Sequence, residues 1–102
     1  MGALVFHTIA VGADLNGAFE QARADAAHEY GTGGYSGSVH EKDSVTLIDE
    51  APRTETKAVA RANELIDQAD SRIDAPRGPA GALPVVTDDA QHGWLIFGWA
   101  AH

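Results

Sequence analysis

The order of apolar and polar positions divides the first thirty residues into a strand and a helix. The segment Leu4–Val11 is rich in β-branched and aromatic residues and is apolar on both of its alternating faces, which predicts a central strand. Asp14 is the expected N-cap of a helix that runs to about Tyr30. Its apolar positions recur at helical spacing, and Gly31 follows as the expected stop. This stripe consists of Leu15, Phe19, Ala22, Ala26 and Tyr30.

Two short strands and a second helix are expected in the middle of the chain. The segments Ser38–Lys42 and Ser44–Asp49 have strand composition, and the few residues between them suit a hairpin. Thr54 is the expected cap of a helix over Glu55–Ser71. Its apolar stripe is strongly amphipathic and consists of Ala58, Val59, Ala62, Leu65, Ile66 and Ala69.

The last third of the chain is expected to hold a long loop and two strands. The segment Asp74–Pro84 contains three prolines and two glycines, which predicts irregular structure. A short strand is expected at Leu83–Thr87 and a longer one at Trp94–Ala100. Trp94 and Trp99 fall on opposite faces of that last strand, so one is expected to pack on the helices and the other to mark a contact surface.

The resulting order β-α-β-β-α-β-β predicts an α+β fold. The economical arrangement is a two-layer sandwich with two helices on a mostly antiparallel sheet, because each helix has one apolar stripe to bury. The first elements match a ferredoxin-like, split βαβ arrangement. At 102 residues, the chain is expected to form a single domain over residues 1–102.

Charge and composition limit the classes of partner. The chain has 15 acidic and 7 basic residues, a formal charge of −8 and no cysteine. The acidic excess makes direct nucleic-acid binding unfavourable and also suits an ordinary soluble surface. No basic leader or membrane-length apolar run is present, so a cytoplasmic protein without membrane contact is expected. An open strand edge and an exposed tryptophan are compatible with a homodimer.

The densest functional signal is the glycine-rich turn that follows the first helix. Four glycines within seven residues allow positive φ angles and let another group approach the main chain. Backbone N–H groups in such a turn can converge on an anion. The expected binding residues for a small anionic ligand or a host protein are Gly31, Thr32, Gly33, Gly34, Tyr35, Ser36, Gly37, Ser38, Glu41 and Lys42.

Named catalytic motifs do not fit this turn. A dinucleotide fingerprint leads from strand to helix, whereas this turn leads from helix to strand, and Ser36 stands where its third glycine belongs. A Gly-Lys-Ser/Thr ending is missing, and Ser38 replaces the last glycine of a nucleophile elbow. The five histidines lack metal-ligand spacing. No catalytic residue, metal site or cofactor is therefore assigned from the sequence.

The same segment carries a resemblance to a known group of proteins. Ala18-Phe19-Glu20 in the first helix, followed by the run from His28 to Lys42, resembles small proteins of actinobacteria and of their phages and mobile elements. These share a Y-G-x-G-G-Y-T/S-G-T/S-I-x-E-K signature, and the match covers residues 4–50. Val39-His40 replaces the usual isoleucine-alanine pair. The resemblance implies a phage-type setting and points to the turn without indicating a reaction.

Three functions are compatible with these observations. The first is a non-enzymatic binding protein that uses the glycine-rich turn. The second is an acidic inhibitor that occupies a basic host surface in the manner of a DNA mimic, since acids are concentrated before residue 51. The third is a small enzyme that uses acid–base groups near Tyr35, but no nucleophile or metal ligand is apparent.

Overall fold

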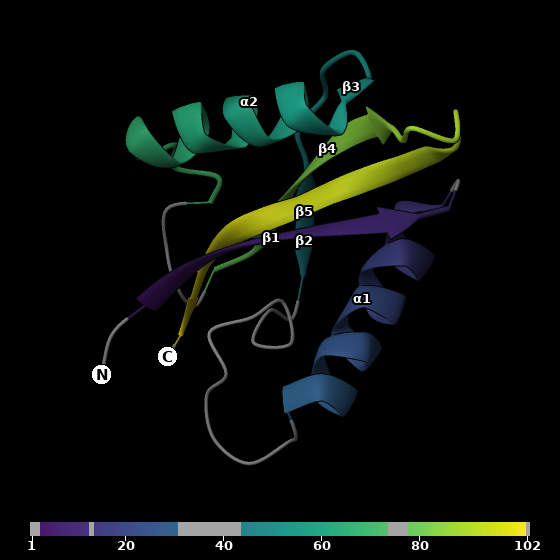
Figure 1. Ribbon diagram of the computed structural model, residues 1–102. Coiled ribbons are helices and arrows are strands. Elements are labelled where there is room, and N and C mark those ends of the chain that lie inside the picture. Colours follow the sequence, from purple (N-terminus) through teal and green to yellow (C-terminus); the bar gives the residue numbers. More distant parts are fainter. Residues whose placement is uncertain (1–2, 13, 31–43, 74–77, 102) are drawn as a thin grey trace.

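The computed structural model describes residues 3–12, 14–30, 44–73 and 78–101. Within these ranges the chain forms five strands and two helices (Figure 1). Their order reproduces the predicted β-α-β-β-α-β-β pattern. The elements are β1 (Ala3–Val11), α1 (Leu15–Tyr30), β2 (Val45–Leu47), β3 (Arg53–Thr54), α2 (Glu55–Asp67), β4 (Ala80–Val86) and β5 (His92–Ala101).

The strands form one mixed sheet in the order β1-β5-β4-β2, with β3 also paired to β4. The long pairs β1–β5 and β5–β4 are antiparallel, whereas β2 and β3 both run parallel to β4. Strands β1, β2, β3 and β4 therefore all run in one direction, and β5 runs against them. The antiparallel pairs are the long ones, and the parallel pairs add two short segments at one edge.

The two helices lie on opposite faces of this sheet, so the molecule has three layers rather than the two expected (Figure 1). The chain passes through α1 from β1 to β2 at the far edge of the sheet, and through α2 back from β3 to β4. Crossovers of the same hand that travel in opposite directions place their helices on opposite faces. The expected ferredoxin-like arrangement is not confirmed, because both β5 and β4 lie between β1 and β2.

Each helix has its own apolar cluster. Alternation along β5 divides its side chains, so that Ile96 faces α1 while Leu95 and Phe97 face α2. Gly81 of β4 is required beneath α2, because a Cβ atom there would lie 2.7 Å from Phe97 Cζ. On the α1 side the buried helical residues are Ala18, Phe19, Ala22 and Ala26, and on the α2 side they are Ala58, Ala62 and Leu65.

Both predicted helix caps are confirmed. The Gly17 N–H donates to Asp14 Oδ2 at 3.0 Å, and the Lys57 N–H donates to Thr54 Oγ1 at 3.4 Å. These side chains satisfy amides that have no partner within the first helical turn.

The end of α2 differs from the prediction, because the helix stops at Asp67 and not at Ser71. Ala69 has φ 53° and reverses the chain, so it leaves the apolar stripe and is exposed. Its N–H donates to Ile66 O, while the Asp70 N–H donates to Leu65 O. This is the Schellman pattern, with alanine in the position that usually holds glycine.

The expected loop over Asp74–Pro84 is wrong from Ala80 onward, where the chain forms β4. The Ala80 N–H donates to Ser44 O, so the main-chain N–H and C=O groups of even-numbered β4 residues point toward β2. The Thr87 N–H donates to Gln91 O, so the main-chain groups of odd-numbered residues point toward β5. By this alternation the missing N–H of Pro84 faces the stretch between β2 and β3. No described strand pairs with β4 there, so the proline removes no ladder hydrogen bond.

The remaining strand predictions have mixed outcomes. The strand expected at Ser44–Asp49 is confirmed in the shorter form of β2, and the last strand is confirmed and extends to His92. The strand expected at Ser38–Lys42 lies outside the described residues. The two-residue strand β3 was not predicted.

Candidate functional site

The predicted binding residues lie outside the part of the chain that the structure describes. This holds for the glycine-rich turn and for the two charged residues after it, and their assignment stays a prediction. The residues concerned are Gly31, Thr32, Gly33, Gly34, Tyr35, Ser36, Gly37, Ser38, Glu41 and Lys42. The described residues present two other features with binding geometry, namely the outer edge of β1 and a pocket at one end of the sheet.

Strand β1 is at the edge of the sheet, and no described strand pairs with its outer side. The Gly12 N–H donates to His92 O, and the antiparallel pairing of β1 with β5 continues without a bulge from Val11 opposite Gly93 to Ala3 opposite Ala101. Even-numbered residues of β1 therefore bond to β5, and the N–H and C=O groups of its odd-numbered residues face outward. The outward-facing main chain extends over the whole strand.

The side chains of this edge are uncharged. Ala3–Val11 contains neither a charged residue nor proline, the residues that usually prevent an edge strand from pairing with another chain. Val5 and Val11 are 37% and 54% exposed. His7 is also exposed, and its Nε2 lies 3.0 Å from Asn63 Oδ1 of α2. This contact holds the imidazole toward α2 rather than toward the outer side of the strand.

The pocket lies where β1, β2 and β4 end and β5 begins, and it has a volume of about 390 Å³. Strands β4 and β5 contribute Pro84, Gly93 and Trp94. Trp94 is half-buried, and its indole Nε1 donates to Gly12 O at 3.1 Å. Because this bond satisfies the polar atom of the indole, the ring offers the pocket an apolar aromatic surface.

The segment between β2 and β3 contributes Leu47, Asp49 and Pro52 to the same pocket. Asp49 is exposed, and no described residue forms a hydrogen bond or ion pair with its carboxylate. His92 is exposed at the start of β5. Asp49 is the only carboxylate among the described residues that line the pocket.

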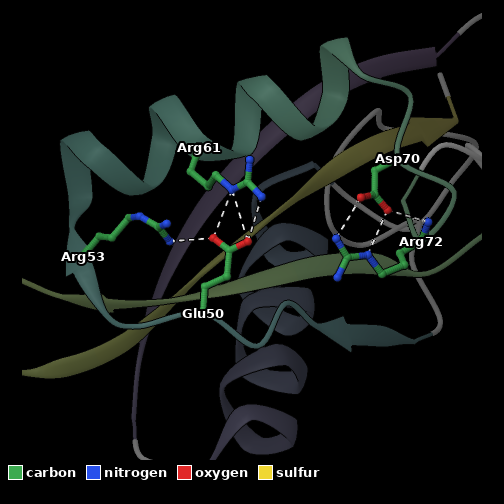
Figure 2. Close-up of polar contacts among 5 residues, drawn as sticks. All are labelled: Glu50, Arg53, Arg61, Asp70 and Arg72. Carbon is green, nitrogen blue, oxygen red and sulfur yellow. Dashed lines mark hydrogen bonds and ion pairs between the residues drawn. The ribbon is translucent and has the colours of Figure 1, made fainter.

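A cluster around Glu50 holds this segment against α2 (Figure 2). Glu50 accepts hydrogen bonds from Arg61 Nε at Oε1 and from Arg61 Nη2 at Oε2, at 3.0 and 2.8 Å, and Arg53 Nη1 lies 2.8 Å from Oε1. The Arg61 hydrogen bonds, with a smaller contribution from Arg53, lower the pKa of Glu50 despite partial burial. The cluster neighbours Asp49 in sequence and thereby fixes the backbone of the pocket segment.

A second ion pair closes the turn after α2 (Figure 2). Asp70 accepts hydrogen bonds from the side chain of Arg72 at 2.9 and 2.8 Å and from its backbone N–H at 2.9 Å. These bonds lower the pKa of Asp70 from 3.8 to about 2. The Asp70 carboxylate is paired with Arg72 within the turn, so this ion pair has a structural role.

Neither tryptophan is fully exposed. Trp94 packs against the α1 cluster, and Trp99 is half-buried opposite Val5 of β1. Among the described residues, no group of three histidine or carboxylate side chains is placed to hold a metal ion. Nor is any described helix long and apolar enough to cross a membrane.

No local sequence motif indicates the pocket. Its residues come from four separate segments and share no motif, because Gly12, Pro52, Pro84 and Trp94 meet only through the sheet. The sequence indicates Trp94 and Trp99 as alternative contact candidates, whereas Pro52 and Pro84 are typical of loops.

The prediction of a central strand at Leu4–Val11 is wrong, because β1 lies at the edge of the sheet. The strand is apolar on both faces because Phe6 and Ala10 belong to the α1 cluster and Ile9 packs against the α2 cluster.

Comparison of the chain with protein-family models, with curated proteins and with solved structures finds no match. The resemblance of the glycine-rich turn to actinobacterial and phage proteins stays a prediction.

Proposed function

We propose that this chain is a binding protein that recognises a partner by adding a strand to the outer edge of β1, and that its partner is a second copy of the chain. The observation that carries this proposal is the uncharged, outward-facing main chain of Ala3–Val11. Strand addition supplies affinity through main-chain hydrogen bonds and specificity through alternate side chains.

Self-pairing is favoured by the sequence of the edge itself. In an antiparallel pair centred on His7, all the outward-facing residues of one strand meet outward-facing residues of the other. Val5 is then opposite Ile9 of the second copy, and β-branched pairs of this kind stabilise a sheet. A two-fold axis at this position is the isologous arrangement that homodimers use most often.

Charge distinguishes the two candidate partners, namely a second copy of the chain and a basic protein. Each chain carries a formal charge of −8, but Ala3–Val11 carries none, so two copies can approach at this edge without a like-charge pair. Salt screens the repulsion between the rest of the two chains. Self-association is therefore expected to strengthen with ionic strength, whereas binding of a basic partner would weaken.

Sedimentation equilibrium of the full chain at low and high salt tests the proposal. The wild type is expected to form dimers, and Val5→Lys combined with Val11→Lys is expected to give monomers because lysine guards edge strands. Leu47→Lys is the control, since Leu47 is 44% exposed but belongs to the opposite edge at β2. A monomeric wild type, or dissociation by Leu47→Lys alone, would refute pairing through β1.

A proline variant tests the main-chain bonds separately from charge. Val5→Pro removes an outward-facing N–H and leaves the hydrogen bonds between β1 and β5 intact. It is expected to weaken dimerisation with an unchanged circular dichroism spectrum. The expected contact of the glycine-rich turn with a host protein or small anion remains a separate prediction, tested by thermal shift with small phosphates.

A further inference from the structure

We infer that the pocket bounded by Trp94, Pro84 and Asp49 is a binding site for a small organic cation, namely an ammonium group attached to an aromatic or branched aliphatic body. This inference is independent of the proposed dimer, because the pocket lies beyond the ends of β1, β2 and β4, and no residue of the pairing strand Ala3–Val11 lines it.

The position of the pocket is the first argument. Strands β1, β2 and β4 run in the same direction and end at this side of the sheet. The connections that follow β1 and β3 contain helices on opposite faces, so the main chain diverges here. Ligands of open sheets with parallel strands commonly bind in such a crevice beyond the carboxyl ends.

The lining of the pocket defines the body of the ligand. Leu47, Pro52, Pro84 and the indole of Trp94 offer apolar surface, and the indole N–H is already bonded to Gly12 O. A volume of about 390 Å³ is near the lower end of the range for small-molecule sites, which is roughly 300–1,000 Å³. A ligand with a single ring or a short branched chain therefore fits this space better than a nucleotide does.

The charge of the pocket defines the polar end of the ligand. The Asp49 carboxylate has no partner among the described residues, and the neighbouring Glu50 is occupied by Arg61 and Arg53. An ammonium group beside Asp49 would form a charge-assisted hydrogen bond, and the aromatic face of Trp94 also attracts cations. An anion would be repelled by the same carboxylate and by the net charge of −8.

Nuclear magnetic resonance of the full chain with 2-phenylethylammonium tests this inference. The chain has two tryptophans, so its spectrum contains two indole N–H signals, which Trp99→Phe assigns. The ammonium probe is expected to shift the Trp94 signal in a saturable manner and to leave the Trp99 signal in place. The matched anion 3-phenylpropionate is expected to produce no saturable shift.

Asp49→Asn is expected to weaken binding of the ammonium probe about five- to tenfold, as expected for loss of a partly screened charge-assisted hydrogen bond. Asp67→Asn is the matched control, since Asp67 is exposed at the end of α2 and does not line the pocket. Absence of a saturable Trp94 shift, equal binding of the anion, or equal affinity of Asp49→Asn would each overturn the inference. Dimerisation by sedimentation is a separate readout, so each proposal can fail alone.

Discussion

Glu50 and Arg61 form a two-point ion pair that connects the segment before β3 to α2. Arg61 Nε and Nη2 donate to the two carboxylate oxygens of Glu50 at 3.0 and 2.8 Å. The parallel fork is the geometry in which arginine binds carboxylates most specifically. Both side chains are about a quarter exposed, at 27% for Arg61 and 22% for Glu50, so solvent weakens but does not cancel the interaction.

Glu50→Gln is expected to lower the free energy of unfolding by about 1 kcal/mol, because it removes one charge from a partly exposed pair. Urea unfolding at neutral pH measures this change. Glu64→Gln is the control, since Glu64 is exposed on the same helix and its side chain makes no hydrogen bond in the described structure. Equal losses for the two variants would show that the fork adds nothing beyond ordinary surface charge.

The turn after α2 is expected to contribute to acid sensitivity through Asp70. Its pKa is about 2 when folded and 3.8 ordinarily, so the unfolded chain takes up a proton first as the pH falls. The stabilisation is therefore complete above the ordinary value and is lost between that value and about 2. Asp70→Asn is expected to be less stable at neutral pH and to lose less stability on acidification.

Urea unfolding at neutral pH and at about pH 3 measures this difference, because stability rises with pH wherever the unfolded state binds more protons. Asp88→Asn is the control, since Asp88 is exposed in the turn between β4 and β5. An unchanged pH dependence in Asp70→Asn would mean that the bonds from Arg72 do not persist in solution.

Elements with a simple periodic pattern were predictable from the sequence. Phe19, Ala22 and Ala26 in α1 are buried as their spacing indicated, as are Ala58 and Leu65 in α2. Periodicity shows that a helix has one apolar face but not which face of the sheet it covers. That choice depends on the order of the strands, and here β5 and β4 lie between β1 and β2.

The start of β4 was missed because its residues have loop composition. Gly81 and Pro84 are poor strand formers in isolation, and Pro79 directly precedes the strand. In the fold, Gly81 makes room for Phe97, and Pro84 lies where the β2–β3 edge of the sheet is open. These are long-range requirements that a local window does not contain. The pocket was missed for the same reason, since β4 supplies part of its lining.

The alternation along β4 gives opposite expectations for prolines at adjacent positions. Pro84→Ala is expected to change the free energy of unfolding by less than about 1 kcal/mol, because its N–H faces no ladder partner. Val85→Pro is expected to cost about 3 kcal/mol more than Val85→Ala, since Val85 faces Gly93 of β5 and its N–H is needed in the ladder. Thermal and urea unfolding measure both. Similar losses at the two positions would contradict the register between β4 and β5.

The last turn of α2 provides a pair of identical substitutions with opposite expected effects. Ala69 has φ 53°, a region that costs an L-residue with a Cβ atom roughly 1–2 kcal/mol. Ala69→Gly removes that strain but increases the entropy of the unfolded chain, so a net stabilisation of about 0.5–1 kcal/mol is expected.

Ala60→Gly makes the same chemical change in the exposed interior of α2, where it is expected to destabilise by about 1 kcal/mol. Urea unfolding of the two variants beside the wild type measures both signs under one set of conditions. If Ala69→Gly destabilised the protein as much as Ala60→Gly, residue 69 would have to be helical. The Schellman bonds from Ala69 and Asp70 would then be excluded, and the helix would continue toward Ser71, as its apolar stripe alone predicts.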